Sequence, residues 1–150
     1  MSDLLVLNDA VIDSLNAAVF SPVFTVTKSF LPRVSRTGSS LRVFVMPTAD
    51  QSIELKSREN LSQHDYSIQV GVISPVTVAD GVVDTVELES FVDLTESIKD
   101  HIIGASDILP GSGVSLLSVA HEPIWDAAIL SENNEYRSAP IFTFRCIRQD

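Results

Sequence analysis

Cysteine and long apolar runs are the first things that this sequence lacks. Its 150 residues include one cysteine, Cys146, which cannot form a disulfide within the chain, so synthesis in a reducing cytoplasm is expected. The longest apolar stretch, residues 68–78, is broken by polar residues and falls short of the roughly 20 residues that a membrane-spanning helix needs. Residues 1–3 lack the positive flank of a secretory signal. We expect a soluble protein that is not exported and has no membrane partner.

Glycine, aromatic and basic residues are also scarce. The chain has six glycines, 7% aromatic residues, and ten basic residues against twenty acidic ones, which gives a net charge of −10. Glycine-rich loops that cradle phosphates are missing, and no stretch alternates aromatic and basic side chains. A protein that grips a phosphate backbone needs clustered Lys and Arg. Nucleotide binding and specific nucleic-acid binding are therefore not expected.

Motifs for catalysis or metal binding are missing as well. The three histidines, His64, His101 and His121, have no partner at ligand spacing. Trp125 stands where a zinc-protease motif beginning at His121 needs its second histidine, so we interpret His121 as a solvated loop residue. Residues 111–113, Gly-Ser-Gly, lack the flanking pattern of a nucleophile turn. We expect no catalytic residue, no metal site and no cofactor, and therefore not an enzyme.

Two local features allow more than one interpretation. Four acids follow one another closely: Asp80, Asp84, Glu87 and Glu89. Their spacing fails the pattern of a calcium-binding loop, and helix capping explains most of them. The single tryptophan, Trp125, lies near His121 and two acids. We interpret it as a core anchor or a subunit contact, and a ligand pocket is the alternative.

Charge is distributed unevenly along the chain. Residues 28–58 contain six of the ten basic residues and two acids, whereas residues 80–135 contain twelve acids and one basic residue, Lys99. A molecule with two faces of opposite sign is suited to head-to-tail association, in which one face meets the other face of the next copy. The alternative is an ordinary solvated acidic surface.

Hydrophobic periodicity predicts two amphipathic helices and several strands. Apolar residues at steps of three and four indicate helices at residues 2–19 and 84–103, the second with a capping box at Asp84 and Glu87 and a closing Gly104. Strands or extended segments are predicted at residues 23–31, 41–46, 52–58, 66–72, 114–120 and 139–147. We expect residues 41–46 and 52–58 to form a long hairpin that turns at 48–51. Residues 123–130 indicate a short helical turn or an edge segment.

This order of elements predicts one α+β domain spanning residues 1–150. Its sheet is expected to be mixed and mainly antiparallel, with about four to six strands. Two helices should pack on one face of that sheet, and a long β-hairpin should extend it.

The arrangement resembles the family of bacteriophage tail terminator and head–tail joining (tail completion) proteins, of the lambda-like tail terminator type. The resemblance covers most of the chain and rests on five segments: the helix at 4–19, Leu55-Lys56-Ser57-Arg58, the Asp65-Tyr66 strand to residue 72, the helix at 84–103, and the Phe-rich strand at 138–145. The chain departs from the commoner pattern by an insertion at residues 23–40.

The resemblance implies a virion protein assembled in the host bacterial cytoplasm. Such a protein forms a ring, typically a hexamer, that caps the tail tube, ends its polymerisation and docks the tail to a head-tail connector or head-closure protein. DNA passes through the channel without specific binding. We expect interface residues on the hairpin and near the tryptophan: Arg42, Phe44, Met46, Glu54, Lys56, Arg58 and Trp125. The acidic cluster named above would face the surface or the channel.

Two other functions remain open. The chain could be another neck or tail component, such as a head-closure or tube-cap protein. It could also be a small cytoplasmic ligand-binding module that uses the region of Trp125 as its pocket.

Overall fold

The structure is a computed structural model that describes residues 3–30, 41–54, 61–105, 108–109 and 113–149. Within these residues the chain has an α+β fold with three helices, a mixed and mainly antiparallel sheet of six strands, and a separate two-stranded hairpin. The elements in chain order are α1 (Asp3–Ala17), β1 (Val26–Lys28), β2 (Arg42–Glu54), β3 (Leu61–Pro75), β4 (Val78–Ala79), β5 (Val82–Val83), α2 (Thr85–Gly104), β6 (Ser115–Ala120), α3 (Ala127–Asn133), β7 (Glu135–Ser138) and β8 (Ile141–Gln149).

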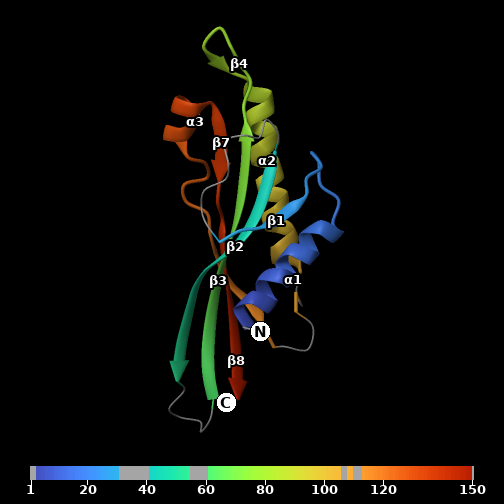
Figure 1. The fold of residues 1–150 in the computed structure, drawn as a ribbon, viewed down its shortest axis with the longest axis vertical. Helices are drawn as coiled ribbons and strands as arrows, with labels where there is room; N and C mark the ends of the chain where they lie inside the picture. Colours follow the sequence, from blue (N-terminus) through green and yellow to red (C-terminus); the bar gives the residue numbers. More distant parts are fainter. Residues whose placement is uncertain (1–2, 31–40, 55–60, 106–107, 110–112, 150) are drawn as a thin grey trace.

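The main sheet has the strand order β1-β2-β3-β8-β6, and β7 pairs with the last residues of β3. The pairs are antiparallel except β1 with β2, which run parallel. Figure 1 shows an elongated molecule, with the β4–β5 hairpin at one end and β2, β3 and β8 reaching the other. The last strand in the chain, β8, lies between β3 and β6.

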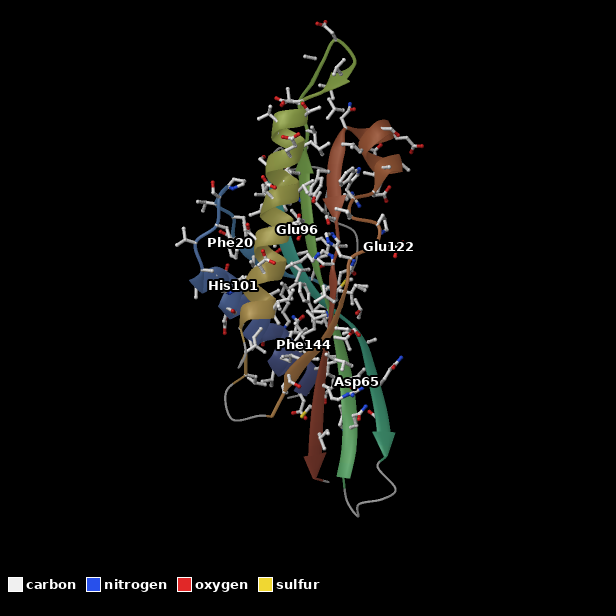
Figure 2. All side chains as sticks on the ribbon, turned by 180° about the vertical axis from the view of Figure 1, so that it is seen from behind. Phe20, Asp65, Glu96, His101, Glu122 and Phe144 are labelled. Carbon is white, nitrogen blue, oxygen red and sulfur yellow. The ribbon has the colours of Figure 1, made fainter. Side chains whose placement is uncertain are left out.

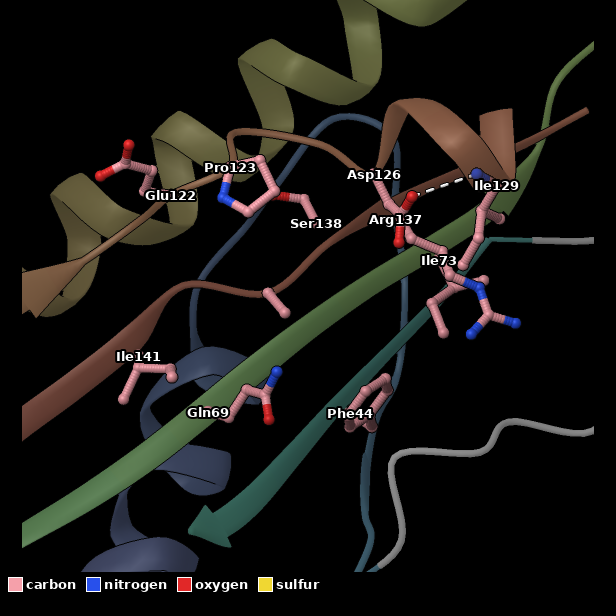
Figure 3. A pocket seen from close by; sticks show the side chains of 11 residues that line it. Phe44, Gln69, Ile73, Glu122, Pro123, Asp126, Ile129, Arg137, Ser138 and Ile141 are labelled. Carbon is pink, nitrogen blue, oxygen red and sulfur yellow. Dashed lines mark hydrogen bonds between the residues drawn. The ribbon is translucent and has the colours of Figure 1, made fainter. Parts of the chain in front are cut away.

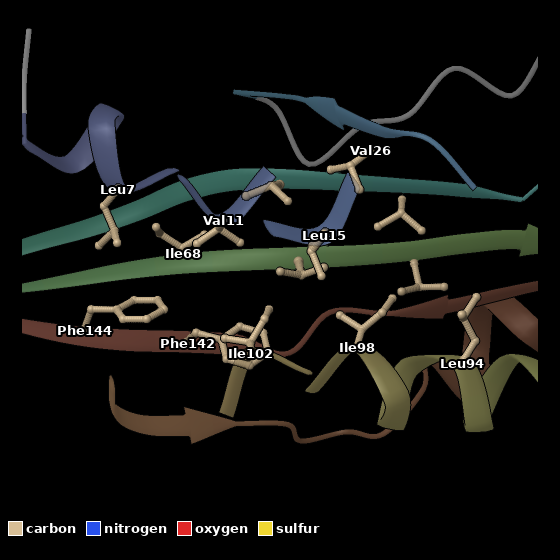
Figure 4. Packing of buried hydrophobic residues seen from close by; sticks show 14 of the residues in the cluster. Leu7, Val11, Leu15, Val26, Ile68, Leu94, Ile98, Ile102, Phe142 and Phe144 are labelled. Carbon is tan, nitrogen blue, oxygen red and sulfur yellow. The ribbon is translucent and has the colours of Figure 1, made fainter. Parts of the chain in front are cut away.

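The hydrophobic core lies between one face of this sheet and the helices α1 and α2. Alternation along β3 and β8 places Ile68, Val70, Phe142 and Phe144 on that face, each at most 1% exposed. The two helices cover them with side chains spaced four residues apart: Leu7, Val11 and Leu15 from α1, and Leu94, Ile98 and Ile102 from α2 (Figure 4). Burial of each such side chain stabilises the fold by about 1.5–3 kcal/mol.

Helix α2 begins as the sequence predicted, but its capping box is incomplete. The carboxylate of Asp84 accepts hydrogen bonds from the backbone N–H groups of Val86 and Glu87, at 3.1 and 3.2 Å. The side chain of Glu87 does not complete the box. It accepts hydrogen bonds from the backbone N–H and the hydroxyl of Thr77 instead, at 3.2 and 2.9 Å. Glu87 therefore joins the start of α2 to the residues before β4.

The segment between β3 and α2, predicted as a loop, is a short hairpin. Asp80 and Gly81 have φ angles of 54° and 76°, and they connect β4 to β5. Positive φ at both central residues is the requirement of a type I′ turn, which Asp-Gly satisfies at low cost.

The long predicted hairpin is present, but its turn lies elsewhere. β2 runs without interruption from Arg42 to Glu54 and pairs with β3, so residues 48–51 lie inside a strand. A bulge between Pro47 and Ala49 explains the error, since it tolerates a proline within the strand. The expected strand at residues 52–58 is the end of β2 as far as Glu54, and the rest lies outside the described residues.

Other boundaries shift by a few residues. The first helix ends at Ala17 rather than 19, and the extended segment at 23–31 contributes β1. The helical turn expected at 123–130 is α3, which begins at Ala127 with Asp126 as its N-cap. The last strand begins at Ile141 rather than 139, and β7 before it was not predicted.

Candidate functional site

A three-stranded ribbon projects from the end of the sheet that lies away from β4 and β5. It consists of residues 49–54 of β2, 61–67 of β3 and 143–149 of β8. Figure 1 shows these strands continuing past the N-terminal end of α1, and Figure 2 places Asp65 on this part of the molecule. β1 pairs with β2 only as far as Val45, and β6 pairs with β8 only as far as Arg145. Within the described residues, the β2 edge of the ribbon therefore lacks a neighbouring strand, and so does the β8 edge beyond Arg145.

The direction of the backbone groups on β2 follows from its pairing. The N–H of Val70 donates to the carbonyl of Pro140, which lies on the β8 side of β3. Even-numbered residues of β3 therefore direct their backbone groups toward β8, and odd-numbered residues direct theirs toward β2. Opposite three of these odd residues stand Ala49, Gln51 and Ile53. Their backbone groups are therefore occupied by the pairing with β3.

The intervening residues present their backbone groups to the two open edges. On β2 these residues are Asp50, Ser52 and Glu54, and on β8 the same alternation selects Ile147 and Gln149. An open strand edge is a template for pairing with another strand. The two edges belong to different strands, so the β2 edge of one copy can pair with the β8 edge of another. The first copy then keeps its β8 edge open, and the second keeps its β2 edge open.

An ion pair crosses the ribbon on the face turned away from α1 and α2. The guanidinium of Arg145 donates two hydrogen bonds to the carboxylate of Asp65, at 2.9 and 3.1 Å. These bonds hold the pKa of Asp65 below its usual value, and the same pair raises the pKa of Arg145. The pairing joins the two strands and leaves little net charge on this face.

Hydroxyl groups surround a buried histidine on the opposite face of the ribbon. His64 contacts the hydroxyl of Ser52 through Nδ1 at 2.9 Å and that of Ser62 through Nε2 at 3.0 Å. Its ring stacks on Tyr66, with 5.8 Å between ring centroids. The carboxylate of Asp50 lies 3.8 Å from Nδ1, beyond hydrogen-bond distance. His64 thus links β2 to β3 within the ribbon.

The predicted interface residues on β2 divide into three groups. Arg42 is the first residue of the strand and is half-buried. Phe44 and Met46 are only 5% and 7% exposed, in a small cluster with Ile73 on the face away from the helices, so they offer little surface to a neighbour. Glu54 is the last residue of the strand. Lys56 and Arg58 lie outside the described residues.

The predicted acidic cluster gathers at the end of the molecule opposite the ribbon. Asp80 forms the β4–β5 turn, and Asp84 and Glu87 have the capping roles described above. Glu89 is exposed on α2, where Asp93, Glu96 and Asp100 continue an acidic stripe at steps of four, three and four residues. Local structure accounts for the first three acids, and the stripe is a solvent-facing surface.

Trp125 lies beside α2 rather than at the tip of a loop. It is half-buried against the main core and borders a groove of about 320 Å³. Leu88 and Val92 form the apolar floor of this groove, and Glu89 and Asp93 stand at its rim. The interpretation of Trp125 as a core anchor agrees with this packing. Its groove also presents apolar surface under a negative rim.

A second depression lies on the opposite face of the sheet, below α3. It has a volume of about 350 Å³, and Figure 3 shows Phe44, Ile73 and Ile141 on the strands facing Pro123. Its charged groups are partly satisfied within the chain. Arg137 pairs with Glu135, and the carboxylate of Asp126 accepts a hydrogen bond from the N–H of Ile129 at 3.1 Å. The cleft therefore has a mixed lining of six apolar and five polar or charged residues.

His121 is not the solvated loop residue that the sequence indicated. Its side chain is 5% exposed, and Nε2 lies 2.6 Å from the hydroxyl of Ser138 and 3.1 Å from the carbonyl of Ile124. Nδ1 is buried, 3.8 Å from the carboxylate of Glu96 on α2 (Figure 2). Burial, and secondarily the positive charge of Lys99, lower the pKa of His121. The residue is a structural link between the segment after β6, β7 and α2.

The described ranges contain neither a metal-binding cluster nor a helix suited to spanning a membrane. These residues contain no group of three or more His, Cys, Asp or Glu side chains that could hold a metal ion. None of the described helices combines the length and apolar character that crossing a membrane requires. No protein family model matches the chain, and no significant match is found among curated proteins.

Proposed function

We propose that this chain is a structural subunit of a bacteriophage virion that assembles with identical copies into a ring at the head–tail junction. The ring caps the tail tube, ends its polymerisation and docks the tail to the connector or head-closure protein. DNA passes through the ring without specific binding. The family resemblance of the sequence and the projecting ribbon support this role together. The two open edges of the ribbon are the observation that carries the proposal.

The geometry of those edges supports head-to-tail association between copies. A β2 edge and a β8 edge lie on opposite sides of the same ribbon, so each copy can add one neighbour on either side. Contacts between two different surfaces generate rings when the rotation between copies closes. β2 and β8 both run toward the tip of the ribbon, so β2 of one copy would run parallel to β8 of the next (Figure 1).

The net charge suits the same role. A channel that DNA must leave freely benefits from a negative wall, because like charge offers phosphates no binding site. The net charge of −10 and the acidic stripe on α2 agree with that requirement.

Native mass spectrometry and electron microscopy of the purified protein test the ring directly. We expect a closed oligomer of about six copies, as the resemblance implies, and a strict monomer at high concentration, both alone and with its tail tube partner, would overturn the proposal. Ser52→Pro tests the edge. It removes an outward-facing N–H while leaving the pairing with β3 in place, so the chain should fold but not oligomerise.

Ser52→Ala is the matched control, since it also removes the hydroxyl that contacts His64 but keeps the backbone N–H. This variant should assemble like the unmodified chain. Equal assembly of the proline and alanine variants would show that the β2 edge takes no part in ring formation.

The cleft below α3 supports a second candidate, a small ligand-binding module. Its volume of about 350 Å³ and its apolar side chains interspersed with polar groups meet the general description of a ligand site. Thermal shift against a panel of small apolar metabolites tests it. A shift that is lost in Ile141→Asp, a change in the lining, would favour this candidate over a purely structural role.

A further inference from the structure

The segment between β6 and α3 is held to the rest of the molecule by few backbone contacts. Residues 122–124 are exposed, and within the described residues no backbone–backbone hydrogen bond involves residues 121–125. The backbone is next fixed at Asp126, whose N–H donates to the carbonyl of Arg137 at 2.9 Å. A segment with few backbone hydrogen bonds and much exposed surface lies at the low end of local stability. Side chains must therefore hold residues 121–125 in place.

Two side chains of the segment are anchored. Trp125 packs against the main core and borders the groove that Leu88 and Val92 of α2 line. His121 is the other anchor, and its Nε2 lies 2.6 Å from the hydroxyl of Ser138 on β7. Of these two side chains, only the imidazole can change its charge near neutral pH.

The immediate surroundings of the imidazole suit its neutral form. The hydroxyl of Ser138 donates to the carbonyl of Ile124 at 2.6 Å, so its proton is not directed at Nε2. Nε2 therefore carries the ring proton and donates it, which leaves an unshared electron pair on Nδ1. Nδ1 is buried, and among the described residues it has no hydrogen-bond partner. A second proton there would place a positive charge in a buried position without an acceptor.

The charged groups around the ring do not offset that cost. α2 contributes the carboxylate of Glu96, 3.8 Å from Nδ1, and the positive charge of Lys99, which already pairs with Glu96 at 3.3 Å. β7 contributes Tyr136, which stays neutral because burial raises its pKa. On the segment itself, Glu122 lines the cleft below α3, and Asp126 caps α3. Burial therefore dominates, and the pKa of the imidazole is lowered.

We infer that His121 is an acid-released latch: its neutral imidazole holds residues 121–125 against α2 and β7, and uptake of a proton releases them. Release is favoured in acid because the charged ring reaches water only when it leaves its buried site. It withdraws Trp125 from α2 and moves Glu122 and Pro123, which line the cleft below α3 (Figure 3). The latch acts within one chain and does not depend on the proposed ring.

Tryptophan fluorescence tests the release, because Trp125 is the single tryptophan of the chain. We would titrate the full chain from about pH 7.5 to about pH 5 and follow its emission together with far-UV circular dichroism. The emission should shift reversibly to longer wavelength as Trp125 becomes exposed, while the circular dichroism stays constant. Constant emission would overturn the latch. So would a shift that appears only together with loss of the circular dichroism, because the whole protein would then be unfolding.

Hydrogen exchange gives the expected size of the effect. Release takes up one proton, so the open population of residues 121–125 should rise about tenfold per pH unit below 6.5, until the folded pKa is reached. After correction for the intrinsic exchange rate, these amides should exchange faster by that factor. They should also exchange faster than the amides of β3, which require opening of the sheet. An open population that does not depend on pH would contradict the latch.

Two histidine variants identify the group that takes up the proton. His121→Gln keeps a hydrogen-bonding side chain but cannot be charged, so its emission should not change over this pH range. His101→Gln is the matched control, since it removes a half-buried histidine of α2 that contacts Ser14 of α1 instead. This control should keep the transition. A transition retained in His121→Gln would overturn the inference.

Two substitutions on α2 should act in opposite directions, and they serve as the test if His121→Gln fails to fold. Lys99→Gln removes the positive charge that opposes protonation in the buried site, so acid should release a smaller fraction of the segment. Glu96→Gln removes the negative charge beside Nδ1, so acid should release a larger fraction. If both variants changed the release in the same direction, or neither changed it, the latch would be wrong.

Discussion

The ring of Phe44 occupies the space above Gly71, its direct cross-strand partner in the β2–β3 hairpin. A Cβ atom on Gly71 would overlap Phe44 Cζ and both Cε atoms. Gly71 is therefore required for close approach between side chain and backbone, and its φ lies outside the left-handed region. The contact allows a large aromatic ring to be 95% buried on a face of the sheet that no long helix covers.

Gly71→Ala should therefore destabilise the protein by about 1–3 kcal/mol, because Phe44 must move out of its position. Urea denaturation measures the change. Gly104→Ala is the control, since a Cβ at that position meets no atom within 4 Å and should be neutral or slightly stabilising. In a Phe44→Ala background, the cost of Gly71→Ala should largely disappear. Additive costs would contradict the contact.

Asp84→Ala should cost about 0.5–2 kcal/mol, because two N–H groups at the start of α2 lose their acceptor. Thermal unfolding followed by circular dichroism gives the change. Asp93→Ala removes an equally acidic, exposed residue from the middle of the same helix and should have much less effect. Equal losses would mean that charge rather than capping determines the stability of α2.

The Asp65–Arg145 pair should make the protein sensitive to strong acid. The pKa of Asp65 in the folded state lies below the unfolded value of 3.8. Its contribution is therefore fully present above pH 3.8 and is lost as the pH falls from there through the lower folded value. Asp65→Asn should flatten this part of the stability profile, measured by thermal melts between pH 2 and 5. Arg145→Met should flatten it too, and the double variant should add little.

His121 should also make the protein sensitive to acid, but at milder pH. Its pKa in the folded state lies below the usual 6.5, so the unfolded chain takes up a proton first as the pH falls. Stability should then decline from about pH 6.5 downward until the folded pKa is reached. His121→Gln should reduce this decline. Ser138→Ala, which removes a partner but keeps the imidazole, should retain it. A wild-type profile that is flat between pH 5 and 7 would contradict the prediction.

The sequence predicted the elements whose signal is local and missed those that depend on pairing. The stripes of α1 and α2 and the alternation of β3 were readable because a single element repeats its own pattern. Pro47 and Asp50 suggested a turn. The sequence does not reveal that β1 ends before it reaches Pro47, so that the strand needs no backbone N–H at this position. The β4–β5 hairpin was signalled by Asp80-Gly81 between valines, but was interpreted as a loop.

Candidate site residues divide in the same way. The capping role of Asp84 could be predicted from its position before an apolar stripe. The burial of His121 could not, because Ser138 and Glu96 reach it from other elements. The open edges of the ribbon required the complete strand order.

The position of β8 between β3 and β6 determines when the sheet can be completed. During synthesis β3 and β6 emerge first, yet neither is the other's partner in the sheet. β3 can pair with β2 on one edge, but its other edge and β6 must wait for the strand that follows them both. Until residues 141–149 leave the ribosome, Phe142 and Phe144 are missing from the core, and the apolar residues that they cover stay exposed. Such a chain folds late and as a whole, and it depends on protection from aggregation until its final strand has been made.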